Sequence, residues 1–237
     1  MIYQLPFTIY TLLSDRYCRI KMSAIAQLLQ EVAEMHCTET GIGYHTLIKE
    51  NKIWVLTRSS YRILSRYPKL DEQVTLRTWS KCYDGLFATR EFEILSQMNE
   101  VLVAGTTQWV IMDIVSRKVN RLSNEFLAGY EHHDQGALTC TSPRLRMPEG
   151  MEMVSEFQVA HSSIDKAQHV NNTEYIRWSI DVLPEEVREK GIRSLDINYN
   201  LETRPEEMVQ IFMLKNDEGY WFQVKNPRGV AVNILMK

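Results

Sequence analysis

The order of hydrophobic and polar positions predicts an α+β protein in which strands outnumber helices. From Ser23 to Gly41 apolar residues recur three and four positions apart, which is the period of one helix face. Four later segments are rich in β-branched and aromatic residues and are separated by turn residues, as in an antiparallel meander. The first half therefore predicts a strand, a long helix and four strands. The expected strands are Tyr3–Leu13, Ile53–Leu64, Gln73–Cys82, Phe87–Ser96 and Val101–Ile114.

The second half repeats this order after a break in the pattern. A strand is expected over Met153–His161, a helix over Asn171–Val182 and a short extra helix over Pro184–Lys190. The repeat predicts a tandem fold of two antiparallel sheets, each wrapped around a central helix, as a pseudo-dimer within one chain. We expect an N-terminal unit at residues 1–122, a linker at 123–150 and a C-terminal unit at 151–237. The last four expected strands are Ser194–Leu201, Met208–Leu214, Tyr220–Val224 and Val230–Leu235.

Aligning the two halves shows where they differ. The offset is 150 positions before the helix and 135 after it, so Arg19 stands opposite His169 and Tyr67 stands opposite Glu202. The first half thus has no counterpart of His169 or Glu202. This asymmetry favours a catalytic role for the pair, and a hydrogen-bonded structural histidine is the alternative interpretation.

A short loop before the second helix carries the polar residues best suited to catalysis. His169 follows Asp165 by four positions. Asn171 is a good N-cap, and Glu174 stands where a capping box needs an acidic side chain. Free backbone N–H groups and the helix dipole at such an N-terminus favour developing negative charge. The loop therefore predicts a site that can polarise a carbonyl group.

Composition narrows the possible partners and cofactors. A net charge of −3 and a pI near 6.1 give no reason to expect nucleic acid. The sequence shows neither a leader pattern nor an apolar run long enough to insert into a membrane, and its widely spaced cysteines are typical of free thiols, so we expect a cytoplasmic protein. There is no Gly-rich phosphate loop, metal-ligand cluster or Gly-x-Ser-x-Gly motif, so no cofactor, metal or serine nucleophile is predicted. The cysteines are Cys18, Cys37, Cys82 and Cys140.

Several stretches of the sequence resemble the acyl-acyl-carrier-protein (acyl-ACP) thioesterases of plants and bacteria. These stretches are residues 28–31, 53–58, 66–68, 109–112 and 168–172, together with Tyr175, Trp178 and Glu202. The resemblance implies a double hot-dog fold and an enzyme of fatty acid biosynthesis. Such an enzyme hydrolyses fatty acyl-ACP to free fatty acid and holo-ACP.

The resemblance also implies the catalytic residues. Asp165, His169 and Glu202 match the family's acidic residue, histidine and glutamate. Ala167 stands where the family has Asn, and Thr203 stands where the plant enzymes have Cys. Thr203 argues against a cysteine nucleophile. Ala167 removes an amide that can orient water or the oxyanion, and losing one such donor can cost about 2.7 to 4 kcal/mol.

The expected roles follow from the needs of thioester hydrolysis. Glu202 is the predicted general base that activates water, with His169 positioning the substrate or assisting proton transfer and Asp165 holding the histidine or the loop. Direct attack by the Glu202 carboxylate stays open. Asn171 and Asn172 are the expected oxyanion or orienting residues. An apolar acyl-chain pocket is expected in the first half, although each of its candidates is an ordinary core residue in the alternative interpretation; they are Ile25, Leu28, Leu29, Val32, Trp54 and Trp109.

Competing functions share parts of this pattern. An acyl-CoA thioesterase would use the same chemistry with another carrier, and a catalytically weakened acyl-binding protein would explain Ala167. A hot-dog dehydratase is disfavoured by the double-length chain and by the sequence around His169. The acyl chain length and the formation of a homodimer are not determined by the sequence.

Overall fold

An antiparallel sheet of eleven strands forms the body of the protein. The structure is a computed structural model that describes residues 2–121, 133–138 and 142–237. The strand order is β1-β3-β4-β5-β2-β8-β11-β10-β9-β7, with β6 paired to β5. The strands are β1 (Tyr3–Thr8), β2 (Lys52–Ile63), β3 (Gln73–Tyr83), β4 (Ala88–Ser96), β5 (Val101–Asp113), β6 (Val119–Asn120), β7 (Glu152–Gln158), β8 (Ser194–Tyr199), β9 (Met208–Asn216), β10 (Gly219–Asn226) and β11 (Gly229–Met236).

The two predicted sheets join edge to edge through β2 and β8. The pairing runs antiparallel from Arg58 opposite Asn198 to Arg62 opposite Ser194, and each half orders its strands identically on either side of it. At this junction the Arg62 guanidinium donates to both carboxylate oxygens of Asp196, at 2.7 and 2.9 Å. Both bonds come from Nη2, and such charge-assisted bonds are stronger than bonds between neutral groups. They hold the register between the halves.

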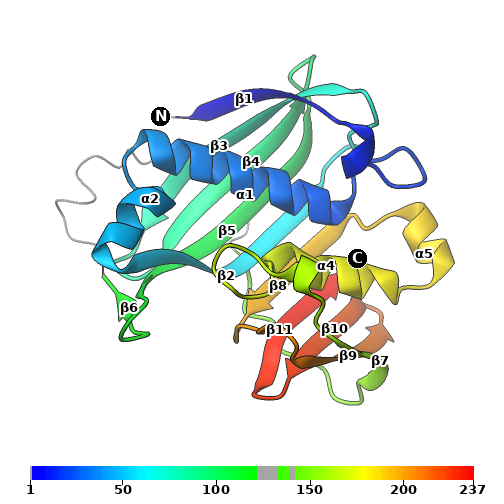
Figure 1. Cartoon of the computed structure of the whole chain (residues 1–237). Helices are drawn as coiled ribbons and strands as arrows, with labels where there is room; N and C mark the ends of the chain where they lie inside the picture. The colour runs from blue at the N-terminus through cyan, green and yellow to red at the C-terminus, as the bar shows by residue number, and fades with distance from the viewer. Residues whose placement is uncertain (1, 122–132, 139–141) are drawn as a thin grey trace.

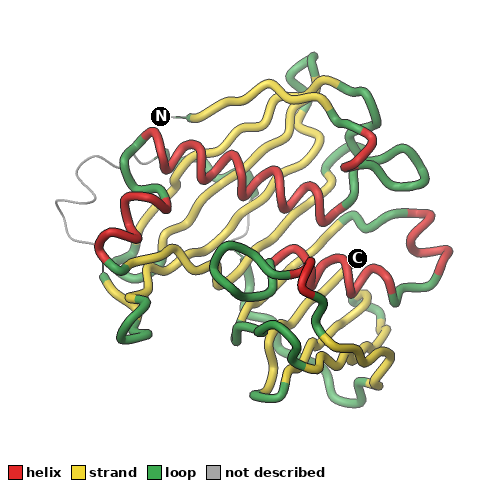
Figure 2. Tube along the Cα trace, viewed as in Figure 1, coloured by secondary structure: helices red, strands yellow, loops and turns green. Residues whose placement is uncertain are grey.

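Two central helices cover one face of the sheet, side by side (Figures 1 and 2). They are α1 (Met22–Glu39) and α4 (Asn172–Asp181). The apolar side of α1 is fully buried, and a continuous hydrophobic cluster runs beneath both helices. Packing of these apolar faces, rather than helix propensity, stabilises the helices. Shorter helices are α2 (Tyr44–Leu47), α5 (Glu185–Lys190) and the 3-10 turns Thr11–Leu13, Ile48–Glu50 and His161–Ser163. Within the described residues no helix has the length and apolar character needed to cross a membrane.

The expected elements are found with shifts at their ends. The first strand stops at Thr8, because the chain then forms the 3-10 turn that leads into α1. The long helix starts at Met22 rather than after a Ser23 cap. The predicted capping box is wrong: Glu174 accepts a hydrogen bond from Ser163 Oγ at 3.0 Å and contacts Arg177, so it does not reach back to the cap.

The described parts of the expected linker lie on the sheet face opposite the helices. The Trp79 indole donates to the Gln135 carbonyl at 2.7 Å, and the Leu145 N–H donates to the Asn198 side chain at 2.7 Å. Because Trp79 belongs to the first half and Asn198 to the second, this segment spans the junction. Residues 123–132 and 139–141 of the expected linker lie outside the described residues.

Candidate active site

A tight loop between residues 164 and 170 presents His169 in front of α4. The Asp165 N–H donates to the His169 carbonyl at 2.9 Å, and Gln168 adopts a left-handed conformation with φ 62°. The Asp165 carboxylate accepts the Ala167 N–H at 2.8 Å. No hydrogen bond joins this carboxylate to the His169 ring within the described residues. Asp165 therefore holds the loop.

His169 and Glu202 come together although they lie on different elements. Glu202 follows β8, and the Val170 N–H donates to the Thr203 carbonyl at 2.9 Å, which ties the two segments. His169 Nε2 lies 3.1 Å from Glu202 Oε2, and each side chain is about one quarter exposed, at 23% and 25%. Both line an open cleft of about 250 Å³, the His169 cleft. Asp165, Ala167, Asn172 and residues 53–57 of β2 also line it.

Arg117 is a neighbour of Glu202 that the sequence analysis missed. It lies in the turn between β5 and β6, and its guanidinium forms an ion pair with Glu202 Oε2, the oxygen that also faces His169. The two residues are 85 positions apart, and no motif links them. Only the folded chain brings this cation of the first half to the carboxylate of the second.

The two predicted orienting asparagines have different places. The Asn171 carboxamide accepts hydrogen bonds from the N–H and the hydroxyl of Thr173, at 3.0 and 2.8 Å, so it is the N-cap of α4 as predicted. Asn172 lines the His169 cleft. The Thr173 N–H is used by the cap and cannot serve a substrate oxygen at the same time. Asn172 is thus the better placed of the two for contact with a bound molecule.

The predicted acyl-pocket residues divide into two groups. Trp54 lines the His169 cleft and also, with Trp109, a smaller cavity of about 50 Å³ beneath α1. Its indole donates to the Ile42 carbonyl at 3.1 Å, which fixes the ring between the two spaces. The helix residues belong to the core instead: Ile25, Leu29 and Val32 are fully buried, and Leu28 packs against them.

The small cavity has a polar wall that the sequence pattern gave no reason to expect. Arg90 on β4 lines it and is only 4% exposed. The guanidinium lies 3.0 Å from His36 Nδ1 and 3.2 Å from Cys37 Sγ. Burial raises the pKa of the Cys37 thiol, which therefore stays protonated at neutral pH.

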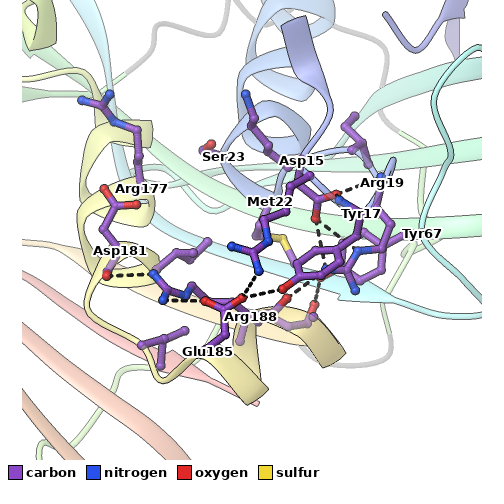
Figure 3. A pocket seen from close by; sticks show the side chains of 17 residues that line it. Asp15, Tyr17, Arg19, Met22, Ser23, Tyr67, Arg177, Asp181, Glu185 and Arg188 are labelled. Atoms are coloured by element: carbon purple, nitrogen blue, oxygen red, sulfur yellow. Dashed lines mark hydrogen bonds and ion pairs between the residues drawn. The ribbon is translucent and has the colours of Figure 1, made fainter. Parts of the chain in front are cut away.

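A second cleft, the Arg19 cleft, lies where the repeat places the counterpart of the first (Figure 3). Its volume is about 410 Å³. The Arg19 guanidinium donates to the Asp15 carboxylate at 3.0 and 3.1 Å and to the carbonyls of Arg188 and Glu189 at 2.9 and 2.8 Å. Its carbon lies 5.1 Å from the Tyr67 ring centre. Arg19 is thereby fully engaged within the protein.

Tyr67 and Gly191 complete the packing of the Arg19 cleft. The Tyr67 hydroxyl donates to the Ile192 carbonyl, and burial raises the pKa of Tyr67 to about 12, so the phenol stays neutral at pH 7. Gly191 has φ 83°, and a Cβ there would lie 2.8 Å from an Arg19 nitrogen and 2.9 Å from the Tyr67 ring. The close approach requires glycine. The residues opposite His169 and Glu202 supply no base.

Metal-ligating side chains are dispersed. Across residues 2–121, 133–138 and 142–237, no three His, Cys, Asp or Glu side chains form a group able to hold a metal ion. The prediction that no cofactor is used stays a prediction.

Solved structures share this architecture over the whole chain. An acyl-ACP thioesterase from Bacteroides thetaiotaomicron superposes with a TM-score of 0.90 at 21% identity, covering 99% of this chain and 96% of that one. A 12:0-ACP thioesterase from Umbellularia californica gives 0.87 at 17% identity, covering 100% and 96%. The predicted α+β double hot-dog fold is confirmed.

Family models identify the two halves in sequence. The model of the acyl-ACP thioesterase N-terminal domain matches residues 1–130, and that of the C-terminal domain matches residues 148–227. The chain belongs to the acyl-ACP thioesterase family, as its motifs predicted. Oleoyl-acyl carrier protein thioesterases of Coriandrum sativum and Arabidopsis thaliana, both chloroplastic, are each 28% identical over 213 residues and 79% of this chain. The matched region is 56% of the length of each plant relative, so the chain spans just over half of them.

Proposed function

We propose that this protein hydrolyses fatty acyl-ACP to free fatty acid and holo-ACP, with the chemistry in the His169 cleft. The single observation that carries the proposal is the pairing of His169 with Glu202, 3.1 Å apart, in a cleft that both halves wall. A carboxylate beside an imidazole in an accessible cleft is suited to activating water. The family of the chain supplies the substrate class.

Each catalytic cycle consumes one water molecule. Glu202 takes a proton from water as the oxygen attacks the thioester carbonyl carbon, and the carbonyl oxygen becomes an oxyanion. When the C–S bond breaks, the proton held by Glu202 passes to the leaving thiolate, with His169 orienting water and thiol. Asn172, through its side chain or its backbone N–H, is the candidate to stabilise the oxyanion, because the N–H groups of Thr173 and Glu174 are bonded to Asn171.

Nucleophilic attack by Glu202 itself would give a mixed anhydride instead. Turnover in ¹⁸O-labelled water followed by mass spectrometry of Glu202 tests for this mechanism. General base catalysis places the label in the fatty acid alone. Hydrolysis of the anhydride at the Glu202 carbonyl leaves the label in Glu202, so labelled Glu202 identifies nucleophilic attack, whereas label in the fatty acid alone fits both mechanisms.

Trp54 stands at the proposed entrance of the acyl chain into the first half. It separates the His169 cleft from the cavity beneath α1, where Trp109 forms part of the wall. This supports a division of labour in which residues 1–122 bind the acyl chain, 123–150 connect and 151–237 carry the catalytic residues. The cavity is small at about 50 Å³, so a chain longer than a few carbons requires the Trp54 ring to move.

The test is a panel of acyl-ACPs of medium and long chain beside the matched acyl-CoAs, with free thiol release as the readout. We expect faster release from acyl-ACP. Faster release from acyl-CoA would assign the other carrier, and binding without release would indicate an acyl-binding protein. The cytoplasmic location stays a prediction; the plant relatives are named chloroplastic.

A further inference from the structure

We propose that Arg117 is a positioning residue for Glu202, contributed by the first half to the reaction site of the second. The inference rests on the proposed role of Glu202 as the general base. It concerns a residue outside the motif on which the family resemblance is based.

Hydrogen bonds within the turn that carries Arg117 fix its backbone. Asp113 Oδ1 accepts the N–H groups of Val115 and Ser116 at 3.1 and 2.7 Å and the Ser116 hydroxyl at 2.8 Å. The hydrogen bonds from Ser116 lower the pKa of Asp113, so this carboxylate is ionised at neutral pH. The Arg117 N–H donates to the Asp113 carbonyl at 2.9 Å, and Arg117 has φ 59°. These contacts fix the backbone position from which the Arg117 side chain extends.

The first half has longer paired strands on the side that carries this turn. β2 begins at Lys52, which pairs with Asp113 near the end of β5. In the second half β8 begins only at Ser194, the counterpart of Ser59, and the counterparts of residues 52–58, residues 187–193, form no strand. In the Arg19 cleft Tyr67 stands at the position of Glu202, and the glutamate that lines that cleft, Glu185, pairs with Arg16 and Arg188. The ion pair of Arg117 with Glu202 therefore has no equivalent at Tyr67.

Arg117, His169 and Arg228 converge on the segment that carries Glu202. Arg117 and His169 Nε2 face the same carboxylate oxygen, Oε2. Behind it, the Glu202 carbonyl accepts from Asn226 Nδ2 at 2.9 Å and from Arg228. The side chain of Arg117 is 49% exposed, and ion pairs this exposed contribute little to folding. Its effect is expected in the orientation of the carboxylate, where a shift of about 1 Å can cost about 10²-fold in rate.

The turn supplies a matched control. Lys118 is the next residue, is exposed and carries the same charge, and no ion pair joins it to Glu202 within the described residues. Any general effect of positive charge on an acidic carrier would change with either residue. A positioning effect would change only with Arg117.

The experiment compares Arg117→Ala, Arg117→Lys and Lys118→Ala on an acyl-pantetheine thioester, which has no carrier protein to dock. For Arg117→Ala we expect kcat to fall about 10- to 100-fold with KM within about twofold. Arg117→Lys should recover part of the rate because it keeps a charge without the fork geometry. Lys118→Ala should match the native protein.

Three results would overturn the proposal: Arg117→Ala equal to Lys118→Ala, an increased rate in Arg117→Ala, or a loss seen only with carrier-bound substrate. A second readout does not need turnover. The NMR signals of the His169 ring should move in Arg117→Ala and stay in place in Lys118→Ala. A native protein that cleaves no thioester would refute the proposed function, while unmoved His169 signals would refute the positioning role alone.

Discussion

The His169 cleft and the Arg19 cleft share a backbone and differ in chemistry. Isolated bridges join Ser14 to Ile20 and Ile164 to Val170, and the left-handed residue of each loop, Cys18 or Gln168, has φ 56° or 62°. Each pair of positions is 150 apart. The duplicated loop was therefore kept as a structure, whereas the side chains it presents are free to differ.

The larger of the two clefts is not the better candidate for catalysis. The Arg19 cleft has the larger volume, but the Arg19 guanidinium is hydrogen-bonded to Asp15 and to backbone carbonyls of the second half. These contacts of Arg19 link the first half to the second. The His169 cleft is smaller, but His169 and Glu202 stay partly exposed and within reach of a ligand.

Removing the proposed base should have the largest effect. Glu202→Ala is expected to lower kcat by between about 10²- and 10⁴-fold, because it deletes proton transfer in the transition state. Tyr67→Phe is the matched change in the Arg19 cleft and should leave the rate unchanged. Steady-state hydrolysis of acyl-ACP measures both. Equal losses in the two variants would contradict the assignment of chemistry to one cleft.

Restoring the family's amide should raise the rate. Ala167 is exposed on the loop, so Ala167→Asn fits without repacking and is expected to increase kcat by up to about 10²-fold by adding an oxyanion or water ligand. Tyr17→Asn, at the equivalent position of the other loop, should have no such effect. If kcat is unaltered in Ala167→Asn, backbone groups already supply this stabilisation.

Loss of Arg19 should weaken folding and spare the chemistry. Arg19→Ala removes the donors to Asp15 Oδ2 and to two backbone carbonyls, which we expect to cost about 2 kcal/mol in the free energy of unfolding. Thermal unfolding should then shift down by about 4–8 °C. The rate per folded molecule should not change. If Arg19→Ala melted at the temperature of the native protein, the contacts of Arg19 would not contribute to stability as we expect.

The smallest expected effect is a change in chain-length preference. Trp54→Leu shortens the partition between the His169 cleft and the cavity beneath α1, so longer acyl chains should gain relative to shorter ones by several-fold in kcat/KM. Trp109→Leu enlarges the cavity without opening its entrance and serves as the control. An unchanged ratio of long-chain to short-chain rates in Trp54→Leu would place the acyl chain elsewhere.

Much of the fold was predictable because it depends on local patterns. Apolar periodicity located the first central helix, the cap residues located the start of the second, and turn residues bounded the strands to within a few positions. The Asn171 cap was also foreseen, since it needs only its own helix start. The capping box failed because Ser163 and Arg177 compete for the Glu174 carboxylate, and sequence spacing does not reveal competitors.

Only the site residues that belong to the family motif, or that the comparison of the two halves singles out, could be predicted from the sequence. The family motif pointed to His169 and Glu202, and the offset of the halves showed that the first half lacks both. Arg117 and the buried Arg90 carry no signal in the sequence, because their partners come from elements far apart in the chain. These contacts form only when the folded sheet brings the distant elements together.

We propose that this duplicated chain keeps one working cleft, the His169 cleft. The most direct test is a calorimetric titration with a non-hydrolysable acyl-ACP thioether. We expect one equivalent bound per chain, with affinity reduced by Asn172→Trp in the His169 cleft and unaffected by Ser23→Trp in the Arg19 cleft. Two equivalents per chain, or a single equivalent lost only in Ser23→Trp, would contradict it.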